Sequence, residues 1–179
     1  YSLIHDDMPL MDNDTYRRGV LTTHKKFDEA TALLAGNSLL TLAFELLADK
    51  KTHPDSFVRS EIIKILASIS GKEGLAAGQS LDLLYEKKRV LEAEILQMHY
   101  LKTARLFEFC VSAPFIMMGS SDKEIIQAKL YGKNFGLIFQ ATDDLLDSIG
   151  TKKKLGKTTN KDLMQNKGSI LLFKDKNEV

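Results

Sequence analysis

The sequence predicts an all-α protein, an antiparallel bundle of helices around a central cavity. Apolar residues recur at the three- and four-residue spacing of amphipathic helices through nearly the whole chain. Strand signals are few, and the 179 residues include only three prolines. This length is about that of one domain, so we take residues 1–179 as a single all-α domain.

The N-terminal half is predicted to contain three helices, at residues 27–48, 57–70 and 75–85. The first ends before a turn that contains Pro54, and Gly71 and Gly74 separate the second from the third. Five residues form the expected apolar side of the first helix: Leu33, Leu34, Leu40, Phe44 and Leu47.

The C-terminal half is predicted to contain two longer helices. One covers residues 90–110 and is expected to bend or end at Pro114, because proline lacks a backbone N–H. The other covers residues 123–149, with Asp122 as its N-cap and Gly150 as its end. A basic, glycine-containing segment follows, which includes Lys157 and Lys167.

Composition and charge argue against several classes of protein. The net charge of +1 gives no global field that favours nucleic acid or an anionic membrane. Cys110 is the only cysteine, which excludes an internal disulfide and fits a reducing, cytoplasmic compartment. No segment looks apolar over the roughly 18 residues of a membrane span, so we expect no stable membrane insertion.

Because the chain begins at Tyr1 with neither Met nor helix cap, we expect it to be the central portion of a longer protein.

Two clusters of carboxylates are the most informative feature of the sequence. The second cluster is Asp143, Asp144 and Asp147, which share roughly one 100° arc of a helix with Gln140. Apolar neighbours predict that this helix is buried on most sides and that its carboxylates face a wet or metal-filled cavity. These neighbours are Phe135, Leu137, Ile138, Phe139, Leu145 and Leu146. A solvated acidic helix face is the alternative interpretation.

The first cluster is Asp6, Asp7 and Asp12. Asp6 and Asp12 lie about 120° apart on a continuous helix, but a kink at Pro9 could bring them together. Carboxylates among apolar residues are costly unless something neutralises them, and Mg²⁺ takes carboxylate oxygens together with phosphates. The two clusters therefore predict one magnesium-binding cleft with acid on both walls. An acidic turn without a ligand is the alternative.

Two adjacent arginines, Arg17 and Arg18, follow the first cluster and precede Gly19. Arginine suits bidentate phosphate contacts. With Asp12 and Asp14 close by, we interpret the pair as part of a metal–diphosphate clamp rather than as donors of surface salt bridges.

Together these motifs resemble those of the trans-isoprenyl diphosphate synthases. Residues 1–12 with Arg17-Arg18-Gly19 are similar to the first aspartate-rich motif of that family, and residues 139–147 to the second. Further landmarks stand in family order: His24-Lys25-Lys26-Phe27, Leu34-Ala35-Gly36, Gly78-Gln79-Ser80-Leu81-Asp82, Lys102-Thr103 and Leu155-Gly156-Lys157. The chain departs from the family pattern at Asn37, where an aspartate is usual, and after Lys167, where Tyr-Pro is missing. The resemblance covers the whole chain and implies the isoprenoid synthase fold.

The resemblance also implies a Mg²⁺-dependent prenyl transfer, in which the dimethylallyl or geranyl group of an allylic diphosphate is joined to isopentenyl diphosphate and the allylic diphosphate group leaves. Three Mg²⁺ ions, with Mn²⁺ as a possible substitute, would be held by the metal ligands Asp6, Asp7, Asp12, Asp143, Asp144 and Asp147. The substrate-binding residues would be Arg17, Arg18, Lys102, Gln140, Lys157 and Lys167. Lys102, Thr103 and Gln140 would be catalytic, directing partial negative charge at the allylic cation.

Product length is predicted from the start of the chain. In this family the residues four and five places before the first aspartate face the growing product, and here they are Ser2 and Tyr1. A bulky Tyr1, with the insertion Met8-Pro9 in the first motif, resembles the pattern of bacterial farnesyl diphosphate synthases and implies a fifteen-carbon product. A geranylgeranyl or other polyprenyl diphosphate synthase is the alternative.

Other functions remain open. A class I terpene cyclase usually pairs one DDxxD motif with an Asn/Ser/Glu motif, whereas this chain has two aspartate motifs. A non-catalytic partner subunit of such a synthase usually loses one or both aspartate motifs.

A homodimer is expected from the resemblance alone. Gln79 and Asp82 are interpreted as polar helix residues of doubtful catalytic role, and His5 and His24 as packing or diphosphate-facing residues.

Overall fold

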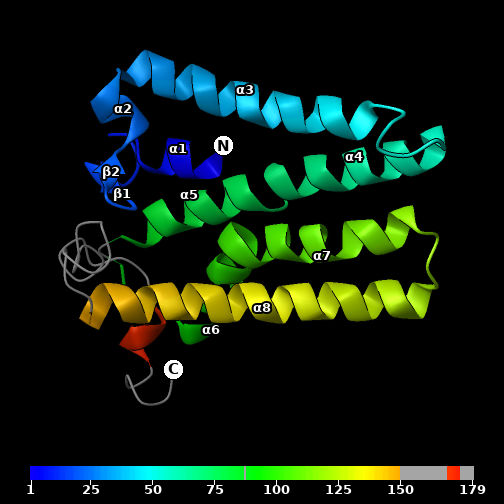
Figure 1. The fold of residues 1–179 in the computed structure, drawn as a ribbon. Coiled ribbons are helices and arrows are strands. Elements are labelled where there is room, and N and C mark those ends of the chain that lie inside the picture. The colour runs from blue at the N-terminus through cyan, green and yellow to red at the C-terminus, as the bar shows by residue number, and fades with distance from the viewer. Residues whose placement is uncertain (87, 150–168, 174–179) are drawn as a thin grey trace.

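A computed structural model describes residues 1–86, 88–149 and 169–173 and confirms the all-α architecture. The long helices lie side by side, with α3 at one edge, α4 and α5 in line next to it, then α7, and α8 at the other edge (Figure 1). The elements are α1 Ser2–Asp6, β1 Tyr16–Arg17, β2 Val20–Leu21, α2 Thr23–Lys26, α3 Glu29–Ala48, α4 Ser56–Ser70, α5 Leu75–Tyr85, α6 Glu92–His99, the π-helical turn η1 Tyr100–Ala104, α7 Arg105–Met117, α8 Asp122–Ile149 and the 3₁₀ turn η2 Ile170–Leu172.

Helix α3 begins after Asp28, whose carboxylate accepts a hydrogen bond from the Thr31 amide at 2.7 Å. Its predicted apolar side is partly wrong, because Leu33 and Leu34 are 46% and 63% exposed. Since α3 lies at the edge of the helix layer, only small residues such as Ala32 are buried in it. The expectation that no segment is apolar enough for a membrane span was also wrong: α3 meets that test by length and composition, which is weak evidence of insertion.

A short hairpin, β1–β2, was not predicted. Tyr16 pairs with Leu21 and Arg17 with Val20. The two residues between the strands, Arg18 and Gly19, have φ angles of 53° and 81°. Positive φ at both central residues is what a two-residue type I′ turn requires, and glycine adopts it without strain. The Arg-Arg-Gly sequence therefore places Arg17 in a strand and exposes Arg18 at the turn.

The helix predicted at residues 90–110 is interrupted in the structure. Helix α6 ends at His99, the five-residue turn η1 follows, and α7 continues to Met117. Pro114 lies inside α7 and does not end it, so of the two predicted outcomes, a bend or an end, the second is wrong. The proline removes one backbone hydrogen bond, while α7 packs against α4 and α8 along its length. This packing sustains the helix for a further turn.

Helix α8 also differs from expectation in two respects. Its first turn is capped by Ser121 rather than Asp122, because Glu124 accepts hydrogen bonds from both the amide and the hydroxyl of Ser121. It is not buried on most sides, since Ile138 and Phe139 are 66% and 52% exposed. In the part of the chain that the structure describes, α8 packs chiefly against α7 and η1, with smaller contacts to α6 and η2 (Figure 1).

Candidate active site

The first acidic cluster forms a turn that folds back on itself. The Asp12 amide donates to the Asp6 carbonyl at 2.9 Å, and the Asp14 amide donates to the Asp7 carbonyl at 3.1 Å. The chain therefore reverses around Pro9 and returns Asp12 to Asp6, as the predicted kink requires. Asp7 and Asp14 are buried, which the sequence alone did not indicate for Asp14.

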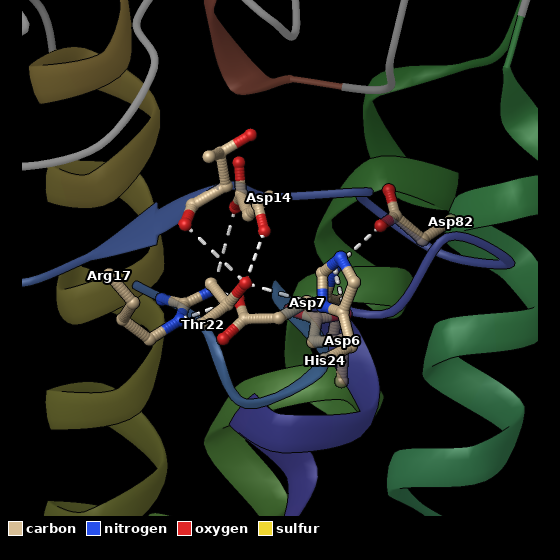
Figure 2. Close-up of polar contacts among 9 residues, drawn as sticks. Asp6, Asp7, Asp14, Arg17, Thr22, His24 and Asp82 are labelled. Atoms are coloured by element: carbon tan, nitrogen blue, oxygen red, sulfur yellow. Dashed lines mark hydrogen bonds and ion pairs between the residues drawn. The ribbon is translucent and has the colours of Figure 1, made fainter. Parts of the chain in front are cut away.

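Arg17 is the nearest cation to this turn. Its Nε donates to Asp7 Oδ1 at 2.7 Å, and a terminal nitrogen lies 3.7 Å from Asp14 Oδ2 (Figure 2). Burial raises the pKa of Asp7, and the hydrogen bond and charge of Arg17 oppose this shift. The structure thus places Arg17, predicted as a diphosphate ligand, in an ion pair within the acidic cluster. Arg18, its neighbour, is exposed at the hairpin turn.

Lys102 of η1 connects the first cluster to α5. Its ammonium lies 2.5 Å from Asp82 Oδ2 and 3.9 Å from Asp6 Oδ1. Burial lowers the pKa of Lys102, but the carboxylates of Asp6, Asp82 and Asp12 outweigh burial and raise it. Lys102 is therefore a permanently charged residue among carboxylates. Asp82, interpreted from the sequence as a polar helix residue, is its nearest partner.

The second cluster is joined to η1 by the next residue, Thr103. The Thr103 hydroxyl donates to Gln140 Oε1 at 2.6 Å, and Gln140 Nε2 donates to Asp144 Oδ1 at 3.0 Å. Asp144 and Asp147 are 5% and 4% exposed, whereas Asp143 is only partly buried. The three carboxylates thus differ in environment although they share one helix.

His99 lies beneath the second cluster and was not identified from the sequence. Its Nε2 is 3.5 Å from Asp144 Oδ2, and its side chain is 2% exposed. Burial lowers the pKa of His99, an effect that the charge of Asp144 opposes. The imidazole is consequently neutral in the folded protein near pH 7.

Both clusters are linked to η1, because Lys102 contacts the first cluster directly and Thr103 reaches the second through Gln140. Lys102 reaches Asp6, and Thr103 reaches Gln140, one helical turn before Asp144. A π turn inserts one extra residue into a helix and is frequent at functional sites. The arrangement supports acid on two walls of one site, the condition on which the sequence interpretation depended.

The residues present suit a hard divalent cation by the chemistry of their donors. Carboxylate oxygens are the ligands that Mg²⁺ prefers, and the backbone hydrogen bond between Asp12 and Asp6 brings two of these residues into one turn. Among the described residues, no three His, Cys, Asp or Glu side chains converge into a ready-made metal site. The cavity of about 240 Å³ between α4, α7 and α8 has none of the clustered aspartates in its lining.

The predicted product-length residues lie at the start of α1. Burial raises the pKa of the Tyr1 hydroxyl, and the Tyr1 ring meets the edge of His5 at 6.2 Å between centroids. Ser2 is the first residue of α1 and is partly buried. The His5 ring is a packing residue: a Cβ added to Gly36 would lie 2.1 Å from its Nε2.

His24 is likewise held within the protein. Its Nδ1 lies 3.3 Å from the Thr22 hydroxyl, which donates to the Asp14 carbonyl at 2.6 Å. The Thr22 hydroxyl thereby joins the two ends of the hairpin, since Asp14 precedes β1 and Thr22 follows β2 (Figure 2). Of the remaining predicted site residues, Lys157 and Lys167 lie outside the described residues.

These features define a class of protein: an all-α protein in which a turn containing Lys102 joins two aspartate clusters whose carboxylate oxygens suit a divalent cation. The family model of the polyprenyl synthetases matches residues 1–178, and the chain belongs to this family.

The chain is similar to farnesyl diphosphate synthase of Micrococcus luteus, with 43% identity over 171 residues that cover 96% of this chain and 58% of the relative. It is 41% identical over 176 residues to geranylgeranyl diphosphate synthase of Cyanophora paradoxa, covering 96% of this chain and 58% of the relative. Geranyltransferase of Helicobacter pylori, solved in complex with magnesium and isoprenyl diphosphate, matches with a TM-score of 0.86 and 37% identity, covering 96% of this chain and 55% of that one. The chain thus spans little more than half the length of these relatives.

Proposed function

We propose that the complete protein is a Mg²⁺-dependent trans-prenyltransferase that condenses geranyl or dimethylallyl diphosphate with isopentenyl diphosphate to give farnesyl diphosphate. The observation that carries the proposal is the contact of Lys102 with Asp6 and of Thr103 with Gln140, which joins both acidic clusters at η1. Family membership and the farnesyl diphosphate synthases among the relatives support it. A geranylgeranyl diphosphate synthase is the second candidate, because the chain matches one such relative at 41% identity and covers the same share of it, 58%, as of the farnesyl diphosphate synthase.

The metal ligands of the proposal come from the two aspartate clusters, and three Mg²⁺ ions, or Mn²⁺ in their place, fit the family pattern. When bound, these ions neutralise the charge of the departing diphosphate. Asp6 and Asp12 would supply oxygens from the turn around Pro9, and Asp143 and Asp147 would supply them from α8. In the neighbouring structure, magnesium accompanies isoprenyl diphosphate, which supports the choice of metal.

The protein's own residues perform the remaining tasks. Lys102 holds a fixed positive charge for the leaving diphosphate, since its pKa is raised. The Thr103 and Gln140 oxygens direct partial negative charge at the allylic carbon from which the diphosphate departs. Arg17 and Arg18, with Lys157 and Lys167, supply further contacts to the two diphosphates.

The experiment that tests this function uses the complete protein with Mg²⁺, geranyl diphosphate and isopentenyl diphosphate, followed by product sizing. A fifteen-carbon product that disappears with EDTA and returns with Mg²⁺ is expected. A terpene cyclase would release a hydrocarbon from geranyl diphosphate alone, and a non-catalytic subunit would release nothing. Either of these results would replace the proposal.

Product length is tested by Tyr1→Ala. The Tyr1 side chain is half-buried at the start of α1, five residues before Asp6. If its ring limits the growing chain, the variant makes twenty-carbon or longer products. An unchanged product distribution would argue against Tyr1 as the limit. Ser2→Ala, which alters little volume next to it, is the matched control.

The proposal also includes a cytoplasmic homodimer. Helix α3 carries exposed leucines along one side, Leu39, Leu42 and Leu46, at 45%, 43% and 57%. Exposed apolar patches of this kind commonly mark protein–protein interfaces. Light scattering of the complete protein should give twice the monomer mass, and Leu42→Lys should shift it toward the monomer.

A further inference from the structure

Asp144 uses both of its carboxylate oxygens within the protein. Oδ1 accepts from Gln140 Nε2 at 3.0 Å, and Oδ2 accepts from the Ser169 hydroxyl at 2.9 Å and the Ile170 amide at 3.0 Å. The residue is 5% exposed. An ionised carboxylate this buried requires such donors, because desolvation is otherwise costly. Its oxygens are therefore committed to the α8–η2 contact and to Gln140.

Two hydrogen bonds in series link the turn η1 to Asp144, and in both of them the donor points toward Asp144. A carboxylate only accepts, so Gln140 must offer its NH₂ group to Asp144 and turn its carbonyl oxygen the other way. That oxygen accepts the Thr103 hydroxyl proton at 2.6 Å. The lone pairs of Thr103 Oγ1 are then directed away from Gln140. Hydrogen bonds arranged in series polarise one another, which increases the negative charge on the last oxygen.

We propose that Asp144 is a positioning residue rather than a metal ligand: through the Gln140 amide it orients the Thr103 hydroxyl, and through Ser169 and Ile170 it fixes η2 against α8. The catalytic part of this inference rests on the proposed function, because Thr103 Oγ1 has an allylic carbon to act on only if the protein carries out prenyl transfer. It separates Asp144 from its neighbour Asp143, although the sequence presents them as an equivalent pair.

Asp144→Asn in the complete protein tests the orientation. Asparagine keeps the shape but offers one acceptor oxygen, so it cannot receive Gln140 and η2 together. We expect kcat to fall roughly a hundredfold, as for a misplaced catalytic group, with the KM for geranyl diphosphate and the Mg²⁺ concentration for half-maximal activity unchanged. Asp143→Asn is the matched variant, and it should raise the Mg²⁺ requirement. An equal rise for Asp144→Asn would overturn the inference.

A second variant, Ser169→Ala, and two further measurements, hydrogen exchange and calorimetry, test the inference without relying on enzymatic turnover. Ser169→Ala removes one donor to Asp144 and is expected to speed hydrogen exchange at the Ile170 amide at least tenfold, as is Asp144→Asn. Calorimetric titration of Mg²⁺ with inorganic pyrophosphate should give wild-type affinity for both variants and weaker affinity for Asp143→Asn. Unchanged exchange at Ile170 in both variants, or weakened titration in Asp144→Asn, would refute the positioning role.

The two proposals can fail separately. If the wild-type protein makes no prenyl product while exchange and titration behave as expected, the proposed function is wrong and Asp144 still fixes η2. If the wild type is active, a cycle with Thr103→Val decides the catalytic part. The Asp144→Asn effect should shrink to less than threefold in the Thr103→Val background, because the oriented hydroxyl is gone. An undiminished effect would show that Asp144 acts by another route.

Discussion

Gly78 is the residue at which one added methyl group would test the geometry of the site most directly. A Cβ at this position would lie 2.2 Å from the Lys102 backbone nitrogen and 2.5 Å from its Cα. Carbon atoms in contact ordinarily stay about 3.5–4.0 Å apart. Because the obstructing atoms belong to the backbone, no side-chain rotation can relieve the clash. Gly78→Ala must therefore move α5 and η1 apart by roughly 1 Å.

The expected change in unfolding free energy combines two opposed effects, and the expected change in rate follows from the displacement of η1. Overpacking of this kind costs about 1–3 kcal/mol, and alanine in place of glycine inside a helix returns about 1 kcal/mol. The net loss of unfolding free energy is therefore about 0–2 kcal/mol. A displacement of about 1 Å at a reacting group costs on the order of a hundredfold in rate. Activity should consequently fall much more than stability.

The assay combines steady-state prenyl transfer with urea unfolding on the complete protein. Ala76→Gly is the matched control, because Ala76 is exposed on the same helix. It should cost about 1 kcal/mol of stability through helix propensity and leave kcat close to the wild-type value. A Gly78→Ala variant with full kcat would refute the reasoning, since Lys102 and Thr103 would then tolerate displacement.

Two further predictions concern charge. Asp82→Asn should lower the unfolding free energy by about 2 kcal/mol in urea, because Lys102 loses its nearest carboxylate while Asp6 remains; an unchanged midpoint would contradict this. Hydrogen bonds lower the pKa of the two helix-capping carboxylates, Asp28 and Glu124, which stabilise the fold above the unfolded pKa. Unfolding free energy should therefore decline as the pH falls below about 4.5 and through the folded pKa values, and Asp28→Asn with Glu124→Gln should flatten that decline; an equally steep profile would count against it.

The sequence predicted the helices most reliably where apolar spacing and turn residues agreed. Helix α5 has the predicted bounds, and α4 begins one residue early at Ser56. The π turn was missed because one inserted residue hardly disturbs the apolar periodicity of residues 90–110. The burial of α8 was overestimated because periodicity shows which residues are apolar, while exposure depends on which elements pack there.

The candidate site shows a similar limit. The return of Asp12 to Asp6 was accessible from Pro9, a local signal. The ion pair of Asp82 with Lys102 was not, because it joins residues 20 apart through the close approach of α5 to η1. The sequence held a partial signal. Gly78 and Asp82 are four residues apart and share one helix face, so a close approach of another element at Gly78 predicts that Asp82 points toward the same element.

Adjacent aspartates in each cluster lie in different environments, because successive residues of a helical turn do not point the same way. Successive residues are turned about 100° from one another, so when one carboxylate faces the site its neighbour turns into the protein. Asp7 and Asp144, the second members of their pairs, are both 5% exposed. Asp7 pairs with Arg17 of the hairpin, and Asp144 receives Gln140 and η2. Each buried carboxylate thus connects its cluster to a separate element of the fold, and in the proposed metal site the less buried neighbours, Asp6 and Asp143, are left as the ligands.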